Sequence, residues 1–113
     1  MKSSLVFVLF GLLLTSSRAA QVPFYIGTFT DNSASKGIYL DSLDNNTGKL
    51  GPLTLAVEAR NPNFLAFSPS HKVVYAVVTT EGDSAVAAYA EQKDGTLKFL
   101  DEQSAGAKGA CHV

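Results

Sequence analysis

The stretch that decides the fold is Asn61-Pro-Asn-Phe-Leu-Ala-Phe-Ser-Pro69, followed after two residues by Lys72-Val-Val-Tyr-Ala-Val-Val-Thr-Thr80. Both segments have the length and the apolar, β-branched composition of strands. The residues between them, Ser68-Pro-Ser-His71, favour a tight turn. Because residues 64–67 form an unbroken apolar run, they predict a strand buried on both faces. The stretch therefore predicts a hairpin at the centre of a β-sheet.

Further strand-like segments lie on both sides of this hairpin. They are separated by short turns rich in Asn, Asp and Gly, which accept the backbone angles of tight turns. We found no convincing amphipathic helix after residue 20, so the predicted fold class is all-β. The expected additional strands are residues 24–30, 38–44 and 50–59 upstream, and residues 85–92 and 97–103 downstream.

The chain repeats itself. Thr47-Gly-Lys-Leu50 aligns with Asp94-Gly-Thr-Leu97, and Tyr25 aligns with Tyr75, which gives a period of about 48 residues. Four short strands in such a period are typical of a β-propeller blade. The second repeat has all four strands, whereas the first lacks the inner one. We therefore expect residues 21–113 to be the N-terminal part of an incomplete β-propeller, about its first two blades. The alternative is a small self-contained β-sheet domain.

The first 20 residues have the order of a secretory signal peptide. Lys2 precedes an apolar run of about ten residues, which is too short to span a bilayer core of about 30 Å. Small residues follow, and we predict cleavage after Ala19 or Ala20. The expected location is secreted or periplasmic, with no membrane association after cleavage. An uncleaved membrane anchor is the alternative.

Composition limits the possible partners. The net charge is −1 and Lys and Arg are dispersed, so no basic stripe predicts nucleic-acid binding. Cys111 is the only cysteine, and the chain cannot form an internal disulfide. Exported small domains usually depend on several disulfides. Either the mature chain is stable without them or it is part of something larger.

Three motifs carry a resemblance to a known family: Tyr25-Ile-Gly-Thr-Phe-Thr30, the Asn61–Pro69 stretch and Gly109-Ala-Cys-His112. In this order they resemble the lactonase family of seven-bladed β-propellers, of the 6-phosphogluconolactonase type. The sequence departs from the family's common pattern at Ser70-His71, at Thr79 and at Ala110, where that pattern has Asp-Gly, Glu and Pro.

The resemblance implies that the full-length protein is a hydrolase of carbohydrate metabolism. It would open a sugar lactone, such as 6-phosphogluconolactone, to the hydroxy acid without a cofactor. The present chain would be inactive without the remaining propeller blades. The alternatives are a muconate-type cycloisomerase and a non-catalytic binding propeller.

Two residues are the predicted site. By the repeat, His112 occupies the position of Phe64, at the start of an inner strand that lines the propeller channel. Its imidazole could activate water or protonate the ring oxygen of a lactone, or it could be a structural histidine. Arg60 could bind a carboxylate or phosphate of the substrate, or make only a surface contact.

We expect no metal site and predict that Cys111 is a buried apolar thiol. Adjacent strand residues point to opposite faces, so Cys111 and His112 cannot easily share an ion. No other ligand cluster is evident in the sequence.

Overall fold

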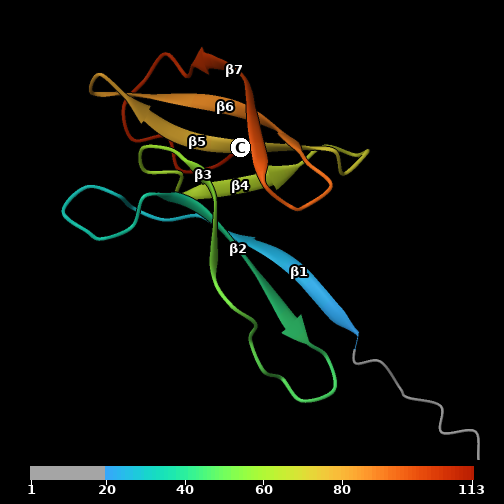
Figure 1. The fold of residues 1–113 in the computed structure, drawn as a ribbon. Helices are drawn as coiled ribbons and strands as arrows, with labels where there is room; N and C mark the ends of the chain where they lie inside the picture. The colour runs from blue at the N-terminus through green and yellow to red at the C-terminus, as the bar shows by residue number, and fades with distance from the viewer. Residues whose placement is uncertain (1–19) are drawn as a thin grey trace, which may run out of the picture.

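The computed structural model describes residues 20–113, so the predicted signal peptide lies outside the described residues apart from Ala20. The described chain consists of strands and loops without a helix (Figure 1). This confirms the predicted all-β class. The strands are β1 (Gln21–Ile26), β2 (Gly37–Asp44), β3 (Thr54–Glu58), β4 (Phe64–Phe67), β5 (Val73–Thr80), β6 (Asp83–Glu91) and β7 (Leu97–Ser104).

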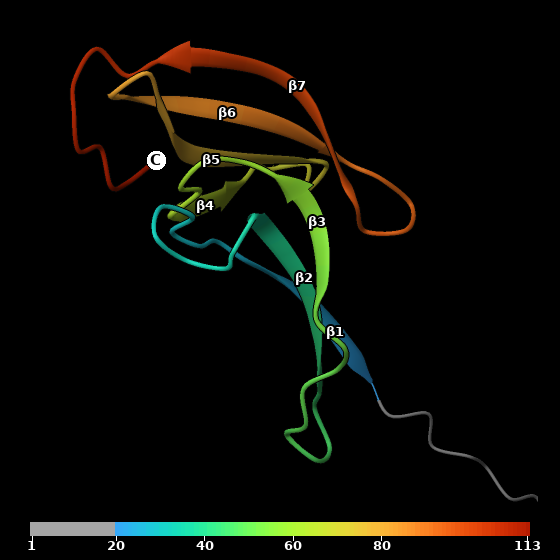
Figure 2. The same ribbon diagram turned by 60° about the vertical axis from the view of Figure 1, so that its left-hand side comes forward.

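The strands form two antiparallel sheets that follow the sequence repeat. One sheet has three strands in the order β1-β2-β3, and the other has four in the order β4-β5-β6-β7. Figure 2 shows the three-stranded sheet lying beside the four-stranded one, with β3 near β7. Within residues 20–113, the first repeat has no counterpart of β4, in line with the sequence prediction.

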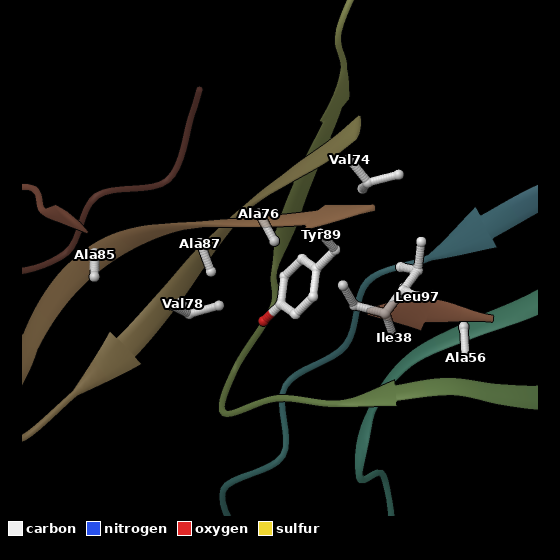
Figure 3. Close-up of a cluster of buried hydrophobic side chains, with 9 residues drawn as sticks. All are labelled: Ile38, Ala56, Val74, Ala76, Val78, Ala85, Ala87, Tyr89 and Leu97. Atoms are coloured by element: carbon white, nitrogen blue, oxygen red, sulfur yellow. The ribbon is translucent and has the colours of Figure 1, made fainter. Parts of the chain in front are cut away.

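Side chains from both sheets form one apolar core between them (Figure 3). Strand alternation places every second residue of β5 and β6 on the same face. Ala76 and Ala87 are fully buried on that face, and their small side chains allow the other sheet to approach closely. Ile38 enters the core from β2 and is also fully buried. The remaining core residues are Ala56, Val74, Val78, Ala85, Tyr89 and Leu97.

Two strands differ from their predicted bounds. β1 ends at Ile26, because the next residue, Gly27, lies against the connection that leads into β4, where a Cβ on Gly27 would collide with the carbonyl oxygen of Pro62. β3 begins only at Thr54. Pro52 has no N–H to donate to a ladder, and Leu50 forms only an isolated bridge with Leu43.

Two predictions of burial are wrong for the described chain. Phe67 is 45% exposed, because it is the last residue of β4 and lies beside the largely exposed turn that leads to β5. The Cys111 thiol is exposed rather than buried, since it follows the last strand in an irregular segment.

Candidate functional site

Antiparallel pairing brings the connections that contain the predicted site residues to one end of the sheets. Tyr39 near the start of β2 pairs with Ile26 at the end of β1, and Phe64 at the start of β4 pairs with Val77 near the end of β5. The C-terminal segment returns to the same end, where β4 begins (Figures 1 and 2). We call this the loop end, formed by residues 27–36, 59–63, 81–82 and 105–113.

Asn61 connects the two sheets at the loop end. Its Oδ1 accepts hydrogen bonds from the backbone N–H groups of Thr30 at 2.8 Å and Asp31 at 3.1 Å. Its Nδ2 donates to Asp31 Oδ2 at 2.9 Å and to Thr79 Oγ1 at 3.3 Å. The side chain is buried and the backbone is left-handed, with φ 50°, a conformation that Asn tolerates better than most residues. Asn61 thus joins the β1–β2 loop of the first repeat to β5 of the second.

Arg60 forms an ion pair with Asp31 beside this junction. Its Nε lies 3.3 Å from Asp31 Oδ1, and its Nη2 lies 3.4 Å from Oδ2. The carbonyl oxygen of Arg60 accepts the N–H of Thr79 at 2.9 Å, which anchors its backbone to β5. The hydrogen bond from Asn61, followed by that from Arg60, lowers the pKa of Asp31. The carboxylate is therefore ionised and able to orient the guanidinium.

His112 lies against the first residue of the inner strand. The His112 and Phe64 rings have centroids 4.4 Å apart and planes inclined by 40°. The irregular segment that carries His112 is held in place at Ala110, whose N–H donates to Ser84 Oγ at 3.0 Å. Because the imidazole is exposed, it is accessible to a ligand at the loop end.

The backbone supports the predicted alignment of the repeats. Gly109 has φ 69°, and Asn61, about one period earlier, has φ 50°. Asn61 leads into β4, and the left-handed turn at each of the two residues sets the direction of the residues that follow. Phe64 and His112 are therefore equivalent in sequence and adjacent in space.

The other histidine lies at the opposite end of the sheets. His71 is exposed in the turn between β4 and β5, where it has φ 56° and lies 6.0 Å from the Phe67 ring centroid. The structure thus brings Arg60 and His112 to one end and separates them from His71.

Sequence reasoning missed the roles of Asp31 and Asn61. The Asn61-Pro62 dipeptide is a turn signal that could have marked the junction. No local pattern pairs Asp31 with residues about 30 positions later, because that contact depends on how the two repeats pack. Asn63 was also missed: its Oδ1 is buried at the loop end without a hydrogen-bond partner among the described residues.

Four surface hollows among residues 20–113 are lined by neither Arg60 nor His112. One of about 290 Å³ lies on the three-stranded sheet and is lined by Ile26, Thr28, Ala34, Ser35, Tyr39 and Leu53. Within residues 20–113, no three His, Cys, Asp or Glu side chains gather as a metal site would require. The same residues contain no helix long and apolar enough to cross a membrane.

The family described as "Lactonase, 7-bladed beta-propeller" matches residues 23–113, which is most of the chain. The chain belongs to the lactonase family of seven-bladed β-propellers. Its two sheets are therefore part of a larger ring, and the four-stranded sheet is a blade of the type that the repeat predicted.

Named relatives of this lactonase-family chain are bacterial. A 6-phosphogluconolactonase of Bacillus subtilis (strain 168) is 34% identical over 90 residues, which are 79% of this chain and 26% of that protein. A 6-phosphogluconolactonase of Formosa agariphila is 26% identical over 92 residues, again 26% of its length. The chain thus spans about a quarter of the length of these relatives.

Solved structures agree with the fold of this lactonase-family chain. A candidate 6-phosphogluconolactonase of Bacteroides fragilis matches with a TM-score of 0.74 and 34% identity, over 86% of this chain and 27% of that one. A candidate 6-phosphogluconolactonase of Bacteroides uniformis matches with a TM-score of 0.73 and 30% identity, over 82% of this chain and 27% of that one.

Proposed function

We propose that the whole protein, of which this chain is a part, hydrolyses a sugar lactone to the open hydroxy acid. The observation that carries this proposal is the 34% identity to a 6-phosphogluconolactonase over 90 residues. A six-carbon sugar lactone with a phosphate or carboxylate is the substrate class that fits a histidine and an arginine at one end of the sheets. Blades outside this chain would complete the site.

In the proposed reaction, His112 is the general base. Its imidazole removes a proton from water as the water oxygen attacks the lactone carbonyl carbon. The bond between the carbonyl carbon and the ring oxygen then breaks, and the ring oxygen takes the proton from the imidazolium. The exposed position of His112 beside Phe64 is suited to this role, because one ring nitrogen can face the substrate while the ring packs on Phe64.

Arg60 is the proposed substrate-binding residue. The Arg60 side chain is 55% exposed, and Asp31 holds its guanidinium from one side, so the guanidinium can also contact an anionic oxygen of the substrate. An oriented guanidinium binds phosphate or carboxylate through paired hydrogen bonds.

The test is turnover of a lactone panel by the full-length protein and two matched variants. We expect His112→Asn to lower kcat by about a hundredfold or more, because general base catalysis typically contributes that much. His71→Asn is the control, since His71 lies at the opposite end and Asn tolerates its left-handed backbone. Absence of lactone turnover by the folded full-length protein, or equal activity of the two variants, would contradict the proposal.

We also propose that the protein is exported and acts outside the cytoplasm. The support is the Lys2 start, the apolar run and the small residues that end at Ala19 and Ala20. Cell fractionation and N-terminal sequencing of the isolated protein test this. A protein that retains Met1 and stays in the cytoplasm would contradict it.

A further inference from the structure

We propose that Asn61 is a positioning residue, whose side-chain amide fixes Asp31 so that Asp31 orients the Arg60 guanidinium toward an anionic oxygen of the substrate. This inference rests on the proposed role of Arg60 in substrate binding. It adds two residues, Asn61 and Asp31, that act through Arg60 rather than on the substrate itself.

Asn61 holds Asp31 at both its backbone and its carboxylate. The Asn61 Oδ1 accepts hydrogen bonds from the backbone N–H groups of Thr30 and Asp31, which fixes the start of the β1–β2 loop. Its Nδ2 donates to Asp31 Oδ2 at 2.9 Å, which fixes the carboxylate of the same residue. Backbone and side chain of Asp31 are thus held by one buried amide.

Asp31 in turn holds Arg60 through both of its carboxylate oxygens. Oδ1 of Asp31 faces Nε of Arg60, and Oδ2 faces Nη2. A guanidinium has five N–H donors in a planar fork, so this contact fixes the plane of the group while using only part of its donors. Among residues 20–113, Nη1 has no hydrogen-bond partner, so its two N–H groups and the second N–H of Nη2 are available to a ligand.

Because both side chains of the ion pair are about half exposed, their contact is weak unless one partner is already fixed. Asn61 supplies that fixed point, since it is only 8% exposed and also bonds Thr79 of the other sheet. Holding a binding group in place before the ligand arrives lowers the entropy cost of binding.

Gly109, the equivalent residue in the next repeat, separates the role of the Asn61 side-chain amide from that of its backbone turn. Gly109 adopts the same left-handed conformation as Asn61, with φ 69° against 50°, but has no side chain. The turn therefore does not require an amide. Asn61→Gly should keep the backbone turn and remove only the hydrogen bonds, because Gly accepts positive φ without strain.

The experiment compares the full-length Asn61→Gly and Arg60→Ala variants with 6-phosphogluconolactone and with the neutral, unphosphorylated gluconolactone. We expect Asn61→Gly to raise KM for the phosphorylated lactone by about tenfold, the effect of one weakened charged hydrogen bond. Its kcat and its KM for the neutral lactone should stay within about twofold of wild type. Asp31→Asn should shift KM in the same direction, since it keeps the shape of Asp31 but not its charge.

The outcomes separate this inference from the proposed function. If Arg60→Ala raises KM for the phosphorylated lactone and Asn61→Gly and Asp31→Asn do not, the positioning role is overturned and the role of Arg60 stands. If Arg60→Ala leaves KM for the phosphorylated lactone unchanged, both the positioning role of Asn61 and the binding role of Arg60 are overturned. An equal rise in KM for both lactones overturns the inference, because it indicates general damage to the site. Should Asn61→Gly not fold, Asp31→Asn decides by the same criteria.

Discussion

Ile38 is the side chain through which the packing of the two sheets is best tested. It is fully buried, and it projects from β2 into a core formed largely by the other sheet. Ile38→Ala removes three carbon atoms, which costs about 2.4 kcal/mol at about 0.8 kcal/mol for each buried methylene. The cavity left behind adds to this, so we expect the free energy of unfolding to fall by about 3–4 kcal/mol.

The assay is urea denaturation of the full-length protein, monitored by circular dichroism. Ile38→Val is the matched control, because it keeps the β-branched shape and removes one methylene. We expect it to cost about 1 kcal/mol, within the usual range for this exchange. The reasoning is refuted if Ile38→Ala costs no more than Ile38→Val, which would mean that the sheets do not close on this side chain.

Three further predictions concern contacts between the sheets. Gly27→Ala should destabilise the protein by about 1–3 kcal/mol, because its Cβ would meet the Pro62 carbonyl; an unchanged Tm would show that the sheets are further apart. Tyr25→Phe should cost about 1 kcal/mol by removing the 2.7 Å hydrogen bond to the Gly95 carbonyl. Burial, and then Glu91, raises the pKa of the Tyr25 hydroxyl in the folded protein. The stability linked to this shift is present below the ordinary tyrosine pKa and is lost as pH rises through the pKa of folded Tyr25. An equally steep loss of stability at alkaline pH in Tyr25→Phe would contradict this. The lowered pKa of Asp31 adds stability above the ordinary carboxyl pKa, and this stability is lost as pH falls through the pKa of folded Asp31. Asp31→Asn should therefore flatten the decline of the free energy of unfolding at acid pH, measured in a pH series. An unchanged dependence of that free energy on pH would be the contrary result.

The strands and their order could be predicted from the sequence. Apolar and β-branched runs between Asn, Asp and Gly turns predict strands because the signal for each lies within a few residues. The repeat then predicted two units of different strand number, and residues 20–113 form one sheet of three strands and one of four. Strand ends were less predictable, since β1 stops where Gly27 meets the Pro62 carbonyl and β3 starts after Pro52.

The sequence by itself determined that this chain is part of a propeller, and it predicted His112 and Arg60 as site residues. It determined these because strand composition, turn residues and a repeat of about 48 residues are local or periodic properties of the chain. Only the tertiary structure decided that Asn61 holds Asp31 and that Asp31 pairs with Arg60. It also decided that Phe64 packs on His112. These contacts join residues about 30 to 50 positions apart, and they exist only because one repeat packs against the next.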